Sequence, residues 1–368
     1  MTPFERRTRR VQSRLAAPGT DADTLALSPG QDLYYLSGVD RDPSDRLLLF
    51  VVPERGDPTF VVPALEAPSV REATWIDDVR TWADETGPDP VLDPVLDDLS
   101  PSRVLLADRM WAAVSLDLRE RLPAASFGLA SEVLGPLRRR KDDRELDHLR
   151  AAAEAADAAM ADVRALGADA VGRTEAELAA FVEERLDAHG GTGVAFDTIV
   201  AAGPNGADPH HATGDREIRP GDPVVLDFGT RVAGYPSDQT RTVVFAGDPP
   251  PAFETVHDVV REATAAGVAA VDPGVRTGAV DRAARSVIEA AGYGDRFVHR
   301  TGHGVGLDVH EAPDIVAGGE VELEPGMVFS VEPGIYLPDR FGVRIEDLVV
   351  VTDDGVDRLN RTDRGWRC

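Results

Sequence analysis

The sequence predicts two domains, a smaller α/β domain over residues 1–137 followed by an α+β domain with a largely antiparallel sheet over residues 138–368. Short apolar runs alternate with turn residues in the first part, as expected for strands interleaved with helices. A break in the pattern falls near Gly135-Pro136. Beyond it, helical and strand-like patterns are partly segregated along the chain. A total length of 368 residues also suits two domains of roughly 150 residues each.

The first domain shows short apolar runs bounded by turn residues, which predict strands of about four to seven residues. These runs are DTLALS, DLYYLSG, DRLLLFVVP, PTFVVP and PSRVLLAD. An amphipathic stretch over residues 110–122 predicts a helix. No run in this domain gathers His, Asp and Glu beside apolar residues, so we expect the chemistry to lie in the second domain.

The second domain opens with two predicted helices. Apolar residues recur at three- and four-residue steps from Leu146 to Val163, with Gly167 just after them. A capping box from Thr174 to Glu177 opens the next helix. A further helical stretch spans about residues 253–291. The strand-like runs are FDTIVAAG, VVLDFGT, YPSDQTRTVVF, MVFSVEPGIYL and VRIEDLVVV.

Composition excludes several classes of function. The chain has 65 acidic and 39 basic side chains, a formal net charge of −26, and a single lysine, Lys141. Such a balance argues against nucleic-acid binding, which needs a basic surface. It is typical of adaptation to concentrated salt, although a GC-rich genome also favours Arg over Lys. The only cysteine, Cys368, leaves no disulfide, cysteine zinc site or cysteine nucleophile.

The sequence shows no pattern typical of a targeting signal or a membrane span. The N-terminal segment has positive charge but no apolar run after it, and no window of 18 apolar residues occurs in the chain. We therefore expect a cytoplasmic protein without membrane contact.

Four acidic residues lie inside otherwise apolar strand patterns: Asp227, Asp238, Glu332 and Glu346. A buried charge is costly unless it is paired or bound to a metal. For any one of them alone, a turn cap or a solvent-facing strand position is the simpler interpretation. Their joint spacing favours a metal.

The spacing suggests two hairpins with facing carboxylates. A hairpin that closes at Val232-Ala233 makes Asp227 and Asp238 direct cross-strand partners, and the two glutamates, Glu332 and Glu346, are symmetric about Asp339. Direct partners have Cβ atoms about 4.5–5.5 Å apart. Like charges at that separation repel, and a divalent cation between them removes the conflict.

His303, in the run TGHGVG, is the expected nitrogen ligand, and we expect the glycines to let the backbone approach the metal closely. Four carboxylates and one imidazole suit Mn²⁺, Co²⁺ or Zn²⁺. They are too many for one ion with an open position, but they suit two ions about 3.5–4 Å apart. The glycine run matches neither the dinucleotide pattern nor a Walker sequence. The chain also has no His-Glu-x-x-His motif and no Gly-x-Ser-x-Gly elbow.

Together, the segments VVLDFGT, YPSDQTRTV, HRTGHGVGLDVHE, VFSVEPGIY and VRIEDLVVV closely resemble the pita-bread metallopeptidases. This family includes methionine aminopeptidase, Xaa-Pro aminopeptidase and Xaa-Pro dipeptidase (prolidase). The resemblance covers about residues 140–360. DLYYLSGV and LLLFVVP resemble the N-terminal domain of the prolidase and aminopeptidase P branch. The resemblance implies an α+β pita-bread catalytic domain with a curved, largely antiparallel sheet, after an α/β domain of the creatinase/prolidase type.

By this resemblance, Asp227 is a terminal ligand of one ion, and Asp238 and Glu346 bridge both ions. His303 and Glu332 complete the second ion. A hydroxide held between the ions would attack the amide carbonyl, with Glu332 as the proton shuttle.

The resemblance also assigns roles around the metals. It makes His310 the residue that stabilises the tetrahedral intermediate, and His210 the one that positions the substrate and its leaving group. We expect His211 and His299 to be structural, and Arg344 to orient the carboxylate of Glu346.

The activity implied is hydrolysis of Xaa-Pro bonds in a dipeptide or short peptide, with two divalent ions, Mn²⁺ first and Co²⁺ or Zn²⁺ as alternatives, in a homodimer. Some archaeal-type prolidases have an arginine for the dipeptide carboxylate where this chain has Asp314. Arg300, Arg340 or Arg344 could replace it, so dipeptidase and aminopeptidase P-like activity stay level. Two alternatives are creatinase-like or lyase activity on a small non-peptide substrate, and a non-catalytic peptide-binding role.

Overall fold

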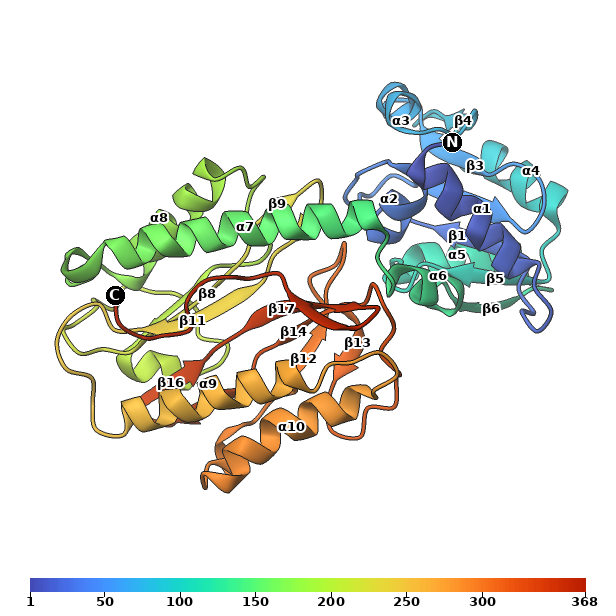
Figure 1. Cartoon of the computed structure of the whole chain (residues 1–368). Coiled ribbons are helices and arrows are strands. Elements are labelled where there is room, and N and C mark those ends of the chain that lie inside the picture. The colour runs from blue at the N-terminus through green and yellow to red at the C-terminus, as the bar shows by residue number, and fades with distance from the viewer. The chain divides into compact units, whose positions relative to one another are not determined.

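The computed structural model describes residues 1–368, which divide into two compact units, Met1–Arg138 and Arg139–Cys368 (Figure 1). No helix in the chain is both long and apolar enough to cross a lipid bilayer.

The first unit contains one six-stranded mixed sheet in the order β4-β3-β2-β1-β5-β6, with parallel pairs at both ends and antiparallel pairs in the middle. This is the α/β architecture expected from the sequence. Its strands are β1 (Thr24–Leu27), β2 (Leu49–Pro53), β3 (Thr59–Pro63), β4 (Asp78–Trp82), β5 (Arg103–Leu106) and β6 (Ser126–Leu129). Its helices are α1 (Pro3–Leu15), α2 (Gln31–Ser37), α3 (Ala67–Ala73), α4 (Asp89–Leu99), α5 (Ala112–Arg121) and α6 (Ser131–Arg138).

The expectation of a strand at DLYYLSG was wrong, because this segment forms helix α2. Leu33 and Leu36 are both fully buried, at the three-residue spacing of a helix face. The helix ends at Gly38, whose φ of 82° is the left-handed conformation common after a helix. In so short an apolar run, helix and strand patterns are hard to tell apart.

The second unit is built from antiparallel strand ladders between two pairs of helices. The helices are α7 (Asp143–Ala165), α8 (Glu175–Ala188), α9 (Phe253–Ala269) and α10 (Thr277–Ala290), with 3₁₀ turns η1 (Gly167–Ala170), η2 (Gly203–Ala207) and η3 (Gly294–Arg296). The strands are β7 (Ile199–Ala202), β8 (Val224–Phe228), β9 (Arg231–Val232), β10 (Tyr235–Pro236), β11 (Gln239–Val243), β12 (Gly302–Gly304), β13 (Glu311–Ile315), β14 (Val328–Val331), β15 (Gly334–Leu337), β16 (Phe341–Arg344), β17 (Asp347–Thr352) and β18 (Gly355–Arg358).

Helices α7 and α8 cover one side of these strands and α9 and α10 the other (Figure 1). Met160 of α7 and Leu186 of α8 pack with Leu226 of β8 in one apolar cluster. On the other side, Phe253 of α9 and Ile288 of α10 pack against β15 and β16. The two helical layers thus pack against different strands, and most residues of these strands are buried.

The helical stretch expected over residues 253–291 is two helices, α9 and α10, rather than one. The break falls at Asp272-Pro273-Gly274. Proline has no N–H to donate to the helix, and Gly274 takes a φ of 83°. The two helices can then pack against each other.

The hairpin between β8 and β11 differs from the expected register by two residues. Asp227 pairs with Thr240 rather than with Asp238. The turn lies at Ala233-Gly234, where both residues have positive φ (50° and 85°), as a type I′ turn requires. Direct pairing of the two aspartates was therefore wrong. Because a shift of two residues keeps each side chain on its face, both still point to the same side.

The second hairpin confirms the expected symmetry about Asp339, whose φ is 60°. Gly334 pairs with Arg344 on one side of the two glutamates, and Val331 pairs with Asp347 on the other. Glu332 and Glu346 lie between these two ladders. Their N–H groups donate to Thr301 O and Thr240 O on other segments, so these carboxylates lie where separate sheets meet.

The Thr174 cap of α8 provides a test of the fold. Its side chain accepts a hydrogen bond from the Glu177 N–H, and Glu177 bonds back to the Thr174 N–H. We expect Thr174→Ala to lower the free energy of unfolding by about 1 kcal/mol, because one helix N–H loses its partner. Thr174→Ser keeps the acceptor and serves as the control in thermal unfolding. Equal stability of the Ala and Ser variants would contradict this.

Candidate metal centre

A single cavity of about 760 Å³ in the second unit brings the predicted site residues together. All seven of them line it: Asp227, Asp238, His303, Glu332, Glu346, His310 and His210. They come from β8, from the segment before β11, from β12, from the two ends of the Asp339 hairpin and from two loops. The site is therefore assembled by the meeting of separate strands and loops, not within one local segment of the sequence.

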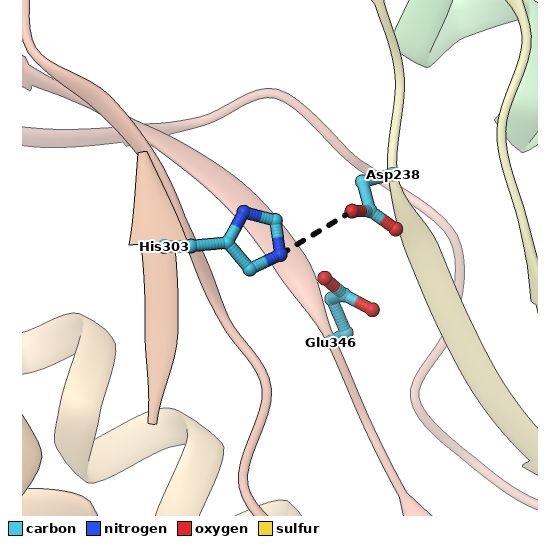
Figure 2. A group of neighbouring side chains, drawn as sticks. All are labelled: Asp238, His303 and Glu346. Atoms are coloured by element: carbon cyan, nitrogen blue, oxygen red, sulfur yellow. Dashed lines mark ion pairs between the residues drawn. The ribbon is translucent and has the colours of Figure 1, made fainter. Parts of the chain in front are cut away.

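Three of these residues form the centre of the cluster (Figure 2). One ligand atom each of Asp238, His303 and Glu346 lies within 4.8 Å of the others, and all three side chains are buried. His303 Nε2 is 3.6 Å from Asp238 Oδ2 and 3.5 Å from Glu332 Oε1. These separations are too long for direct hydrogen bonds. The donor atoms face one another across a gap.

Asp227 is held by Arg344, whose Nη2 donates to Asp227 Oδ2 over 2.6 Å. The same guanidinium donates to Tyr336 Oη and Thr240 Oγ1. We expected Arg344 to orient Glu346, but it contacts Asp227 directly and reaches Glu346 only through Thr240. The reason is that β16 ends at Arg344 and the chain then changes sheets, so Arg344 and Glu346 do not share one strand face.

Glu346 is oriented by Thr240, whose hydroxyl donates to Glu346 Oε2 over 2.6 Å. Its other oxygen, Oε1, is buried and has no hydrogen-bond partner. Asp227 Oδ1 is in the same condition. A buried carboxylate oxygen without a partner costs desolvation free energy. A bound cation would give both oxygens a partner.

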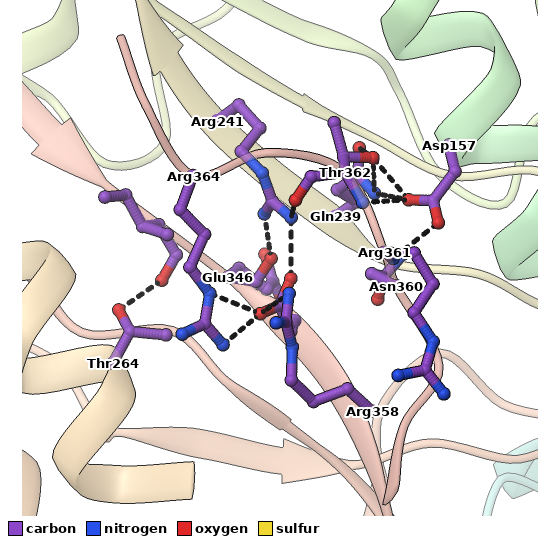
Figure 3. A network of polar contacts seen from close by, with 12 residues as sticks. Asp157, Gln239, Arg241, Thr264, Glu346, Arg358, Asn360, Arg361, Thr362 and Arg364 are labelled. Atoms are coloured by element: carbon purple, nitrogen blue, oxygen red, sulfur yellow. Dashed lines mark hydrogen bonds and ion pairs between the residues drawn. The ribbon is translucent and has the colours of Figure 1, made fainter.

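Behind Glu346 lies a buried ionic network (Figure 3). Asp347 is fully buried and pairs with Arg241, Arg358 and Arg364. The Arg241 guanidinium also donates to the backbone carbonyl of Glu346 and, from Nη1, to Thr240 O over 2.9 Å. This network holds the backbone of the segment that carries Glu346, so the position of its carboxylate is determined from two directions.

The carboxyls of the cluster resist ionisation. Burial raises the pKa of Asp238 well above its usual range, and the charges of Asp227 and Glu332 raise it further. Burial likewise raises the pKa of Glu346, with Asp238 as the next cause. For Glu332, burial outweighs the opposing charge of Arg344 and raises the pKa to about 7. Divalent cations would favour the ionised forms.

His303 is a neutral imidazole in this setting. Burial, with His310 as the next cause, lowers the pKa of His303 to about 3. Its Nδ1 lies 3.2 Å from Gly304 O, a geometry that suits a proton on Nδ1. The lone pair of Nε2 then faces Asp238 and Glu332, as a metal ligand requires.

His310 and His210 border the centre. The His310 ring centroid is 4.1 Å from that of His303, in an edge-to-face arrangement. His210 lies in the loop after η2, where its N–H donates to Asp208 Oδ1 over 3.0 Å. Both face the cavity from loops rather than from the sheets.

The other two histidines that line the cavity, His211 and His299, contact polar side chains around it. His211 Nε2 lies 2.8 Å from the buried carboxylate of Glu175. His299 Nε2 lies 2.9 Å from Tyr336 Oη. Sequence reasoning missed Thr240 and Tyr336. Thr240 was detectable, because it lies two residues after Asp238 and so shares its strand face, whereas Tyr336 gave no signal.

The glycines around His303 lie in close contact with neighbouring segments of the chain. A Cβ on Gly302 would lie 1.8 Å from Ser330 O, and one on Gly306 would lie 2.2 Å from Glu311 Oε1. The glycines therefore allow close approach of a neighbouring strand and of the Glu311 side chain.

Only one of the three candidate arginines offers a cation to the open cavity. Arg300 lines it, is partly exposed and pairs with Asp314, the residue found in place of the family arginine. Arg344 also lines it but is buried and holds Asp227. Arg340 donates to Pro251 O and does not line the cavity.

The residues present fit a metal centre. They offer four carboxylates and one neutral imidazole, the donors that Mn²⁺, Co²⁺ and Zn²⁺ accept. Two buried oxygens, Asp227 Oδ1 and Glu346 Oε1, have no hydrogen-bond partner and are available as metal ligands. The raised carboxyl pKa values come from burial and from neighbouring carboxylates, and a bound cation would offset both causes.

Comparison with known proteins is consistent with a metal centre in the second unit. Residues 147–353 match metallopeptidase family M24, and residues 7–139 match the creatinase/prolidase N-terminal domain. The chain is 43% identical over 340 residues to the probable dipeptidase PepE of Mycobacterium tuberculosis, covering 91% of this chain and 89% of the relative. It is 37% identical over 349 residues to the Xaa-Pro dipeptidase of Lactobacillus helveticus, covering 93% and 94%.

A solved prolidase from Thermococcus sibiricus superposes with a TM-score of 0.93 at 36% identity, over 100% of this chain and 99% of that one. The fold and the resemblance inferred from the sequence are thereby confirmed. The chain belongs to metallopeptidase family M24, with a creatinase/prolidase-type domain before the catalytic one.

Proposed function

We propose that this protein is a metal-dependent peptidase that hydrolyses Xaa-Pro bonds, and that dipeptides are its main substrates. The observation that carries the proposal is the convergence of five ligand-type side chains on one cavity, with two buried carboxylate oxygens that lack partners. The names of relatives, a probable dipeptidase and an Xaa-Pro dipeptidase, support the choice of bond.

Asp227, Asp238, His303, Glu332 and Glu346 would hold two divalent cations, which when bound supply Lewis acidity and an activated water. Glu332 lies at the open side of the cluster, 3.5 Å from His303. Its carboxylate can take a proton from the attacking water and pass it to the leaving proline nitrogen.

Two histidines would act on the substrate itself. His310 lies beside His303 and would donate a hydrogen bond to the oxygen that becomes negative as the carbonyl is attacked. His210, on the loop across the cavity, would hold the substrate and its leaving group in line. An Xaa-Pro amide has no N–H, so its recognition needs no acceptor at that atom.

Arg300 supports the preference for dipeptides. A dipeptide carries its free carboxylate close to the scissile bond, and Arg300 is the partly exposed guanidinium of the cavity. Its present partner, Asp314, is itself exposed, so a substrate carboxylate can compete for the same donor groups. Arg300 would thus take the role left open by Asp314.

Four finer points also belong to the proposal. We propose Mn²⁺ as the first choice of metal, because the donors are mainly carboxylates. We propose a homodimer, by resemblance to the family. We propose a cytoplasmic location, because the sequence shows no targeting pattern. The net charge of −26 supports work in concentrated salt.

Hydrolysis assays with Mn²⁺ or Co²⁺ in molar salt test the activity. We expect turnover of Xaa-Pro dipeptides and slower turnover of Xaa-Pro tripeptides, and loss of activity after chelation at the same salt concentration. Matching Xaa-Ala peptides are the substrate control. Absence of turnover in protein with two bound metal ions would rule out the peptidase. Faster tripeptide cleavage would make it an aminopeptidase instead.

The carboxyl pKa values predict how metal stabilises the fold. The metal-free folded chain keeps protons on Glu332, Asp238 and Glu346 that the unfolded chain releases, so this cluster loses stability as pH rises from about 4.5, through the folded pKa of Glu332 at about 7. Bound Mn²⁺ replaces those protons. We therefore expect Mn²⁺ to raise the melting temperature more at about pH 8 than at about pH 5.

Calorimetry of the metal-free and metal-loaded protein measures this difference. Glu346→Gln should reduce the pH dependence, whereas Asp353→Asn, on an exposed turn, should leave it intact. A metal effect that is equal at both pH values would show that the cluster does not bind the ions.

The role of Arg300 gives a separate prediction. Arg300→Gln should raise KM for an Xaa-Pro dipeptide about tenfold or more, because a charge-assisted contact to its carboxylate is lost. The corresponding dipeptide amide has no such charge and should be little affected. Steady-state kinetics on both substrates measure the difference. Arg340→Gln is the control, and an equal loss on acid and amide would refute a carboxylate contact.

A further inference from the structure

The single lysine of the chain lies in an unusual place. Arginine supplies every other basic side chain of the 39, yet Lys141 has been kept, and its side chain has no exposed surface. Lysine is among the residues least often fully buried unless it is paired. Arginine takes the place of lysine at all other basic positions of the chain. We infer that an arginine side chain does not fit the space around residue 141.

Lys141 makes a buried ion pair across a long stretch of sequence. Its Nζ lies 2.7 Å from Oε1 of Glu311, whose side chain is 11% exposed. Glu311 follows His310 directly and begins β13. Its carboxylate occupies the space that a Cβ on Gly306 would fill. The absence of a side chain at Gly306 thus makes room for the carboxylate that Lys141 holds.

The segment between β12 and β13 carries two site residues. His303 lies within β12, and His310 ends the loop that returns to β13. The two strands pair at Gly304 and Glu311, next to an irregularity in register between His303 and Gly304. Such an irregularity locally disrupts the hydrogen bonds of the ladder. The Glu311 side chain gives the loop a second attachment.

The other end of the pair is anchored independently of that loop. The Lys141 N–H donates to Gly326 O over 2.8 Å, and Arg140 forms a bridge with Met327. Gly326 in turn donates to Val351 O of β17. Lys141 therefore connects the loop of His310 to the turn that leads into β14, the strand before Glu332.

We propose that Lys141 and Glu311 are positioning residues that hold the loop of residues 305–310 so that His310 faces the reacting carbonyl. This inference rests on the proposed function of the site and extends it to two residues that do not touch substrate. An ammonium on a slender stem fits the enclosed space, whereas a planar guanidinium is broader and donates in fixed directions.

Kinetics of variants measure the coupling to His310. Lys141→Met and Glu311→Gln should each lower kcat on an Xaa-Pro dipeptide about 10-fold to 100-fold with little change in KM, as expected for a misplaced catalytic group. Lys141→Arg should not restore kcat. In a His310→Ala background, Lys141→Met should lower kcat further by less than about threefold, because the side chain through which Lys141 acts has already been removed.

A matched control comes from the neighbouring residue. Arg140 pairs with Glu324 at the surface, and it lies beside the same turn. Arg140→Met removes an ion pair of the same type from the same segment, and it should leave kcat and KM within about twofold. An equal loss of kcat in both variants would reduce the role of Lys141 to general support of the fold.

A spectroscopic measurement does not depend on activity. In metal-free, histidine-labelled protein, the His310 ring signal is identified by its disappearance in His310→Ala. Lys141→Met and Glu311→Gln should shift that signal and leave the signal of His257, on α9, in place. Circular dichroism should show an unchanged fold.

The outcomes separate the two proposals. A wild-type protein without Xaa-Pro turnover, but with the expected shift of His310, removes the proposed function and leaves the positioning role. Three results would overturn the positioning role. They are losses of kcat that multiply in full in the Lys141→Met, His310→Ala double variant, a His310 signal that does not shift, and a kcat restored by Lys141→Arg.

Discussion

The close approach of buried carboxylates is the constraint on which the rest of the catalytic unit depends. Asp227, Asp238, Glu332 and Glu346 face one cavity, and their mutual repulsion adds to the cost of burial. An apolar core without a metal site would not place four carboxylates together, because burial and repulsion would destabilise the fold. Here they are held in place because a metal centre needs oxygen donors that are ready before the ion arrives.

The surrounding structure keeps these carboxylates together by charge and by hydrogen bonds. Arg344 holds Asp227 from the cavity side, and Arg241 holds the backbone of Glu346 from behind. Both arginines are buried, and each donates hydrogen bonds to several acceptors. The ligands are thus supported by residues that touch neither metal nor substrate, which is how metal sites keep their geometry. Lys141 extends the same arrangement to the loop of His310.

Much of this could be predicted from the sequence, where the signal is local. The capping box at Thr174 and the symmetry about Asp339 depend on residues close together in the chain, and both were correct. Errors arose where two local patterns compete. The run DLYYLSG suits a helix or a strand at that length, and the β8 to β11 hairpin could close at either of two adjacent dipeptides. The hairpin closes at Ala233-Gly234, where both residues have positive φ, a conformation that Gly234 adopts without steric cost.

The sequence by itself indicated which carboxylates would gather, because four acids in apolar strand patterns at hairpin-compatible spacing together favour a cation, although none of them does so alone. Tertiary structure decided what holds them. Thr240, Tyr336, Arg241 and Lys141 are separated from their partners by 8 to 170 positions in the chain. For Thr240, Arg241 and Lys141, no periodicity or local propensity encodes the pairing, because it exists only after distant segments of the chain meet. Tyr336 and Arg344, by contrast, meet within one hairpin.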